Sequence, residues 1–400
     1  MARSLGSLWL KTLKRMGRAQ QVRSRRLVKS LLPTPPRVRA VRLPPTSLSA
    51  VPKPQKLARK PSARAAHPAT GLAGTWSKSW HLRPAQGPLT PARRMLYWLY
   101  RPLGSQPHPQ PLVVMLHGCQ QTSEEFAAAT RMNALAERKG FAVLYPQQSV
   151  GVDSHRCWHW YKRSTQQGQG EVALIAGMIK QVQARFLLDA SRTYAAGLSA
   201  GAALATILAL RHPKLIAAVG LHSAPVFGTA DSALSAYRVM QHGSSAARSA
   251  VQALPECQGM PVILIHGDSD SVVRRINMTQ LAAQFQLVNA PWLSNGAASK
   301  QDHAARPGGR SPRHGYQLET RYAGGKPQLV TCRITSLGHA WSGGDASMAF
   351  SVSEGPDAAL LMWTFFSRHR QAAAVTSLTD QTAAGATTRK PAKPPTPSRP

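Results

Sequence analysis

Short, continuously apolar runs alternate along the middle of this chain with longer amphipathic stretches. Runs over 111–118, 193–198 and 262–266 are typical of buried strands, and the stretches over 171–186 and 200–210 are typical of helices. Strands that are apolar on both faces need a covering layer on each face. The alternation therefore predicts an α/β fold, a mostly parallel sheet with helices on both faces. Functional side chains are expected just beyond the carboxyl ends of the strands.

The same patterns divide the chain into three parts. The catalytic domain is predicted over 75–371, between a disordered basic N-terminal arm over 1–74 and a disordered C-terminal tail over 372–400. Further strands are predicted over 94–100, 141–145, 217–222 and 330–337, and further helices over 126–139, 275–287 and 355–369. The stretch over 289–315 is long and basic, and is expected to be a flap or an insertion.

The charge is concentrated at one end of the chain. The formal net charge is +34, and 22 Lys and Arg residues precede Glu124, the first acidic residue. Such an arm favours non-specific contact with an anionic surface. Before Trp76 the only aromatic residue is Trp9, so specific nucleic-acid recognition by base stacking is not expected. No apolar run reaches the roughly 18 residues of a transmembrane helix.

The most informative motif is Gly197-Leu198-Ser199-Ala200-Gly201, which matches G-x-S-x-G. It stands between a predicted strand and a helix of small residues, as a nucleophile elbow requires. An ordinary glycine-rich turn is the alternative. The context favours Ser199 as a nucleophile.

A nucleophilic serine needs a histidine base that is held by an acid. In α/β-hydrolases the acid and then the histidine follow the serine along the chain, each after a strand. Asp268 and Asp270 follow the strand over 262–266. His339 follows the strand over 330–337. Asp270 is the preferred acid because it stands further into the loop, and Asp268 is expected to cap the turn.

The oxyanion of the tetrahedral intermediate needs backbone amides. The residue after the nucleophile, Ala200, supplies one, and Cys119 in the loop after the strand over 111–118 is predicted to supply the second. The four cysteines, Cys119, Cys157, Cys257 and Cys332, allow two disulfides in three connectivities, or four reduced thiols. No C-x-x-C pair, phosphate loop or dinucleotide motif occurs, so neither a metal nor a cofactor is expected.

Several further motifs carry a family resemblance. They are LHGCQQ (116–121), YPQQ (145–148), CWHWY (157–161), GQGE (168–171), AAGLSAGAALA (195–205), AAVGLHSA (217–224) and GHAWSGG (338–344). In this order they resemble the polyhydroxybutyrate (PHB) depolymerase family of serine esterases, within the α/β-hydrolase superfamily, over about 94–369. The resemblance implies a triad of Ser199, Asp270 and His339. It also implies an oxyanion contact at Cys119 and aromatic positions around the cleft at Trp158, Trp160 and Trp341.

The resemblance implies cleavage of short-chain polyhydroxyalkanoate or its oligomers through an acyl-enzyme on Ser199. Feruloyl or acetylxylan-type esterase activity on a small ester is the first alternative. An amide-cleaving relative with the same triad is another, and an anion-binding protein that acts through its basic arm belongs to a different class. Many members of the family are secreted, which implies an extracellular location. The apolar stretch over 5–10 is too short for a clear signal peptide, so a cytoplasmic location also stays open.

Overall fold

The computed structural model of this protein describes residues 71–85, 92–104, 108–252, 254, 259–293, 298–305 and 314–371. Most of the predicted basic arm and all of the tail over 372–400 lie outside the described residues. Within the described ranges, no helix is both long enough and apolar enough to cross a bilayer.

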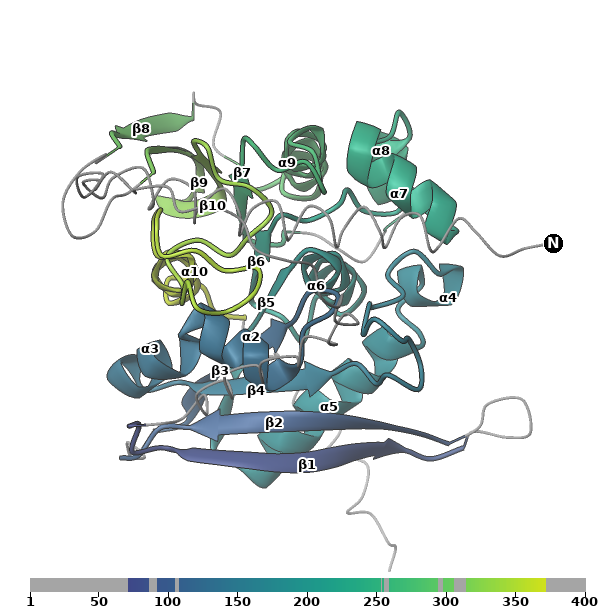
Figure 1. The fold of residues 1–400 in the computed structure, drawn as a ribbon, viewed down its shortest axis with the longest axis vertical. Coiled ribbons are helices and arrows are strands. Elements are labelled where there is room, and N and C mark those ends of the chain that lie inside the picture. Colours follow the sequence, from purple (N-terminus) through teal and green to yellow (C-terminus); the bar gives the residue numbers. More distant parts are fainter. Residues whose placement is uncertain are drawn as a thin grey trace, which may run out of the picture.

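One mixed sheet runs through the described part of the chain (Figure 1), in the order β1-β2-β4-β3-β5-β6-β7-β10-β9-β8. The strands β4, β3, β5, β6, β7 and β10 are parallel neighbours, and antiparallel pairs extend the sheet at both ends. The bounds are β1 Thr75–Arg83, β2 Arg93–Arg101, β3 Gln110–Leu116, β4 Ala142–Gln147, β5 Leu188–Leu198, β6 Ala218–His222, β7 Val262–Gly267, β8 Ser299–His303, β9 Tyr316–Ala323 and β10 Lys326–Ile334.

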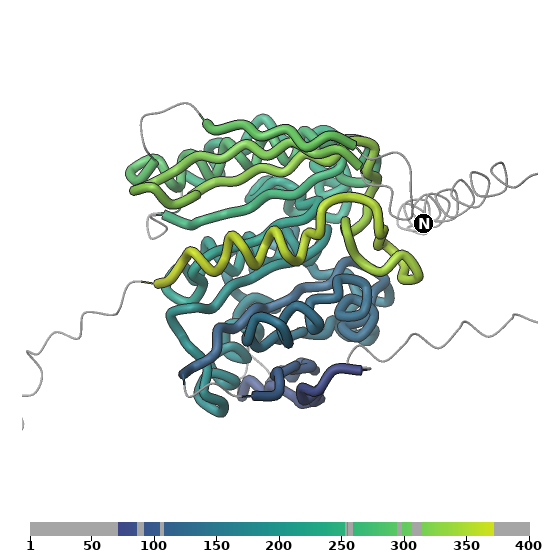
Figure 2. Tube along the Cα trace, turned by 90° about the vertical axis from the view of Figure 1, so that its left-hand side faces the viewer, coloured from purple at the N-terminus to yellow at the C-terminus, as the bar shows by residue number. Residues whose placement is uncertain are grey.

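Helices cover both faces of this sheet, as the apolar strands require. One face carries α5 (Glu171–Arg185), α6 (Ala200–Arg211) and α9 (Ile276–Val288), and the other carries α2 (Ser123–Thr130), α3 (Met132–Lys139) and α10 (Ala358–Phe366). Figure 2 shows α10, in yellow, in front of the strands that it covers. The remaining helices are α4 (Arg163–Gln166), α7 (Ala233–His242) and α8 (Ala247–Gln252).

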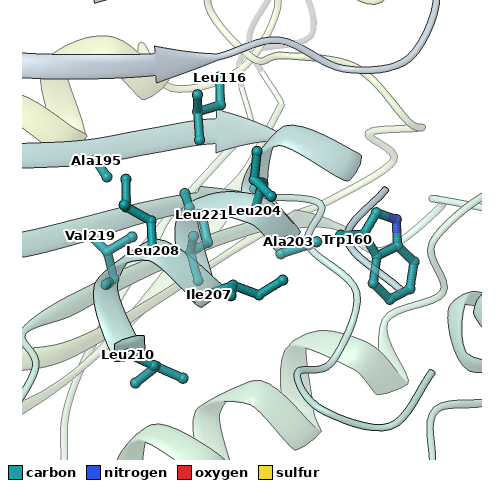
Figure 3. Close-up of a cluster of buried hydrophobic side chains, with 14 of the residues drawn as sticks. Leu116, Trp160, Ala195, Ala203, Leu204, Ile207, Leu208, Leu210, Val219 and Leu221 are labelled. Carbon is teal, nitrogen blue, oxygen red and sulfur yellow. The ribbon is translucent and has the colours of Figure 1, made fainter. Parts of the chain in front are cut away.

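The helix α6 is the best-covered helix of the described domain. Every residue from Ala200 to Leu210 is buried. Leu204, Ile207 and Leu208 pack in one cluster with Leu116 of β3 and strand residues of β5 and β6, and Trp160 lies at one end of that cluster (Figure 3). A helix that is apolar all round forms where sheet and neighbouring helices enclose it. This packing fixes the start of α6, and with it the residue that precedes the helix.

The structure differs from the sequence-based expectation in several elements. The single helix expected over 126–139 is two helices, because Arg131 adopts a left-handed conformation with φ 54° and ends α2. The strands β1, β8 and β9 and the helix α7 were not predicted. The stretch over 289–315 contains β8, whose exposed residues pair antiparallel with β9. The residues of β8 have low strand propensity, so pairing with β9 decides their conformation.

Candidate active site

Ser199 lies at the sharp turn between β5 and α6. Its backbone has φ 57° and ψ −120°, and its amide donates to the His222 carbonyl at 2.9 Å. A Cβ atom on Gly201 would come within 2.1 Å of the Leu116 carbonyl oxygen, and one on Gly197 within 2.5 Å of the Gly201 carbonyl carbon. Helix and strand can therefore approach this closely only with glycine at both positions. The turn presents Ser199 to a cavity.

The structure pairs His339 with Asp270. The Nδ1 atom of His339 lies 2.8 Å from Oδ2 of Asp270. The other carboxylate oxygen accepts the amides of Val272 and Val273, each at 2.9 Å. Asp268 does not contact His339 in this way. Its carboxylate accepts the Ser336 amide at 2.7 Å on an exposed turn. The three hydrogen bonds of Asp270 leave its carboxylate one orientation, directed at His339.

The Asp270 carboxylate is ionised although it is buried. Burial by itself raises the pKa of a carboxyl group, but the attraction of His339 and its hydrogen bond outweigh this effect. Together with His266 and the Val273 amide, they hold the pKa of Asp270 at about 2. A charged acid beside His339 favours the tautomer that carries its proton on Nδ1, which leaves Nε2 free to act as a base.

Two further histidines lie behind this pair, and burial lowers the pKa of each. Loss of hydration and, to a smaller extent, the neighbouring His266 lower the pKa of His222 to about 3. His266 is also buried, and its lowered pKa has the same first cause. The Nε2 atom of His266 lies 2.7 Å from the Val273 carbonyl and 3.7 Å from Oδ2 of Asp270. Both rings therefore support the site as neutral groups.

The loop after β3 contains Cys119, whose amide is the one expected to bind the oxyanion. The Gly118 amide donates to the Gln121 side chain at 2.9 Å, and the Gln120 amide donates to the His155 carbonyl at 2.6 Å. Among the described residues, no acceptor occurs for the amide of Cys119. Cys119 and Ala200 both line the cavity that Ser199 and His339 line.

A disulfide holds this loop in place. It joins Cys119 to Cys157 across a sequence separation of 38 residues. The pairing settles part of the choice that the sequence left open, since Cys332 is a free, buried thiol. Cys257 lies outside the described residues.

The cavity has a volume of about 380 Å³ and is mostly apolar. Trp158 and Trp160 form part of its wall, and the Trp158 indole nitrogen donates to the His117 carbonyl at 2.9 Å. The opposite wall comes from α7, which the sequence analysis did not predict. It includes Tyr237 and Met240. The signal in the sequence was the capping box at Ser232, which begins α7.

Trp341 is not among the residues that line this cavity. The side chain is fully buried, and it packs against the edge of Phe126 and stacks on His222. It belongs to the core on the face of the sheet that carries α2, α3 and α10. Trp341 therefore packs beside His222 in the core, behind the residues that line the cavity.

Across the described ranges, no three His, Cys, Asp or Glu side chains are arranged to hold a metal ion. The polar groups that line the cavity include the Ser199 hydroxyl, the His339 imidazole and backbone amides, together with the side chains of Gln120, Gln121, Asp153 and His155. This set provides a nucleophile, a base and hydrogen-bond donors.

Comparison with known proteins places this site in a family. The esterase PHB depolymerase family matches residues 95–305, which include Ser199 and Asp270. Poly(3-hydroxyalkanoate) depolymerase C of Paucimonas lemoignei is 33% identical over 57% of this chain and 54% of its own length. Poly(3-hydroxybutyrate) depolymerase of Ralstonia pickettii is 26% identical over 41% of the chain and 35% of its own length. The chain therefore spans about half the length, or less, of these relatives.

Other relatives carry different names. Acetylxylan esterase A of Emericella nidulans is 32% identical over 30% of this chain and 40% of its own length. The solved acetyl xylan esterase of Aspergillus awamori has a TM-score of 0.51 at 21% identity, over 65% of this chain and 94% of its own, which shows a shared fold. The strand order and the elbow agree with the α/β-hydrolase fold. Because the family match spans just over half of the sequence, the chain belongs to the esterase PHB depolymerase family.

Proposed function

We propose that this protein is a serine carboxylic-ester hydrolase with Ser199 as nucleophile, His339 as base and Asp270 as the acid that orients His339. The observation that carries the proposal is the buried Asp270–His339 hydrogen bond of 2.8 Å beside a cavity that Ser199 also lines. A serine on a strained turn, an imidazole held in one tautomer and unpaired amides are the parts that acyl transfer needs.

The proposed reaction has two steps. His339 accepts the Ser199 proton as the hydroxyl attacks the ester carbonyl, and the amides of Cys119 and Ala200 stabilise the oxyanion that forms. Collapse of this intermediate releases the alcohol, to which His339 returns the proton. A water molecule, activated by His339, then attacks the acyl-enzyme and releases the acid. Asp270 stays ionised and stabilises the imidazolium in both steps.

For the substrate we propose short-chain polyhydroxyalkanoate oligomers, such as those of 3-hydroxybutyrate. Two relatives, in Paucimonas lemoignei and Ralstonia pickettii, are named as depolymerases of such polymers, which supports this class. The apolar cavity of about 380 Å³ suits a short acyl chain. The second candidate is a small acetyl or aryl ester, which the aromatic wall of Trp158, Trp160 and Tyr161 favours.

The test is turnover of p-nitrophenyl butyrate by the wild type and by Ser199→Ala, over a series of acyl lengths. We expect the variant to lose at least about 10³-fold in kcat and the wild type to prefer short chains. Circular dichroism of the variant controls for folding. Equal, negligible turnover by both proteins on every ester would contradict the proposal.

We also propose that the arm over 1–74 makes non-specific contact with an anionic surface and takes no part in the chemistry. Its support is the charge distribution in the sequence. Deletion of the arm should spare turnover of a soluble ester and abolish any retention on heparin that moderate salt disrupts. Loss of ester turnover on deletion would contradict this division.

A further inference from the structure

A second cavity, of about 720 Å³, lies at the edge of the sheet, beside β1 and β2. Figure 1 shows these two strands together at that edge. The other wall comes from the segment over 147–171. Cations from both walls line this cavity, here called the cationic groove: Lys78, Arg93, Arg94, Arg156 and Lys162.

These cations have no carboxylate partners. Among the described residues, no carboxylate lies within 4.0 Å of any of the five, whereas Arg192 and Asp189 elsewhere on the domain do form an ion pair. Two acidic residues also line the groove, Glu124 and Glu171. The buried Glu171 carboxylate is already bound by His159, so it neutralises little of this charge. The groove therefore carries an excess of positive charge, because its five cations face only Glu124 and Glu171.

Two of the cations are held in place by aromatic rings. The Nζ atom of Lys78 lies 5.3 Å from the centre of the Trp98 ring, and the Arg94 guanidinium lies 4.8 Å from the centre of the Trp80 ring. Both pairs lie on paired strands, so their spacing is fixed by the sheet. Such contacts order the side chains before a ligand arrives, which lowers the entropic cost of binding.

The cationic groove borders the catalytic cavity. The segment over 149–162 contributes to both, since Asp153, His155 and Cys157 line the catalytic cavity and Val152 and Arg156 line the groove. Arg156 itself has a left-handed backbone with φ 52°. The segment therefore lies between the two cavities, and a ligand at the catalytic cavity that is long enough to cross it would meet the groove.

We propose that the cationic groove binds the terminal carboxylate of a 3-hydroxyacyl oligoester whose ester bond lies at Ser199. This inference rests on the proposed function. The acid end of such an oligomer always belongs to the alcohol side of the bond that is cleaved. Attack by Ser199 breaks the bond between the carbonyl carbon and that alcohol oxygen, and the released hydroxy acid carries the carboxylate. Guanidinium groups suit this ligand because they bind carboxylates with two parallel hydrogen bonds.

The test compares the 3-hydroxybutyrate trimer as free acid with its methyl ester, which is equal in length and lacks the charge. In the wild type, kcat/KM should be higher for the acid, mainly through KM, and the preference should shrink in salt. The variant Lys78→Gln/Arg94→Gln should lower the ratio of acid to methyl ester about tenfold. The matched control Arg248→Gln/Lys300→Gln removes the same charge from exposed positions outside both cavities and should retain the wild-type ratio.

Calorimetry with Ser199→Ala separates this inference from the proposed function. We expect Ser199→Ala to bind the acid trimer more tightly than the methyl ester, and this binding to weaken when Lys78 and Arg94 are also replaced. That result would support the groove even if no trimer were hydrolysed. Equal binding of the two trimers would overturn it. Heparin binding that depends on Lys78 and Arg94, without preference for the acid trimer, would also overturn it and assign the groove to a sulfated polyanion.

Discussion

The Nδ1 atom of His339 lies 2.8 Å from Oδ2 of Asp270, although 69 residues separate them in the chain. Two parallel neighbours, β7 and β10, bring the two loops together, because both strands end at the same edge of the sheet. The Asp268 amide also donates to Ile334, the last residue of β10, at 3.0 Å, and thereby ties the two loops. The parallel pairing of β7 with β10 therefore brings Asp270 and His339 together.

The two neighbouring aspartates provide a matched test of this pair. We expect Asp270→Asn to lower kcat on p-nitrophenyl butyrate by about 10³–10⁴-fold, because an amide cannot stabilise the imidazolium and favours the wrong tautomer. Asp268→Asn should stay within about twofold of the wild type, since its amide oxygen can still accept the Ser336 amide. Equal losses in both variants would refute the assignment of Asp270.

Removal of the Cys119–Cys157 disulfide should affect both stability and turnover. The variant Cys119→Ser/Cys157→Ser should lose about 2–5 kcal/mol in the free energy of unfolding. Its kcat should also fall, by roughly 10-fold or more, because the Cys119 amide is no longer held at the oxyanion. Urea unfolding and ester kinetics measure the two effects. Dithiothreitol should cause the same losses of stability and kcat in the wild type and leave the variant unchanged. If the wild type resisted the reductant and the variant kept full activity, the disulfide would have no role in holding the Cys119 amide.

Stability should decline in mild acid because of the buried histidines. Burial lowers the pKa of His117 to about 4 and that of His222 to about 3, whereas the unfolded chain titrates near 6.5. The unfolded state then binds more protons. The contribution of these neutral histidines to the free energy of unfolding is therefore complete above about pH 6.5, and it is lost as the pH falls towards their pKa values in the folded state. We expect the urea midpoint to fall by roughly 1 M between about pH 7.5 and about pH 5.

His117→Gln should flatten this pH dependence, even if it lowers stability overall. The exposed His242→Gln is the matched control and should keep the wild-type slope. An identical slope in all three proteins would mean that other groups cause the acid sensitivity.

Tyr237 on α7 should contribute to binding of longer acyl chains. The residue is 41% exposed at the wall of the catalytic cavity, so removal of its ring leaves the core intact. Tyr237→Ala should raise KM for p-nitrophenyl hexanoate about threefold to tenfold and change KM for the acetate much less, because only the longer chain covers the ring. Tyr322→Ala, at 38% exposure and outside the cavity, is the control. No change with acyl length would remove Tyr237 from the substrate site.

Much of the fold could be predicted from local pattern. The strands around 111–118, 193–198 and 262–266 are continuously apolar, and the structure places them in the centre of the sheet as β3, β5 and β7. Edge elements could not be predicted in this way. The residues of β8 are all exposed, and only pairing with β9 makes them a strand. Arg131 gives no sequence signal of the left-handed turn that divides α2 from α3.

The sequence by itself determined the order and chemistry of the candidate site. Ser199 follows a strand between two glycines, and Asp270 and His339 follow later strands. These features are local, because strand, turn and residue type are set within a few positions. Which tryptophans line the cavity, which cysteines pair and which cations share a groove depend on contacts between segments far apart in the chain. Trp160 and Trp341 look alike in the sequence, yet packing puts Trp160 at the cavity and encloses Trp341 between Phe126 and His222.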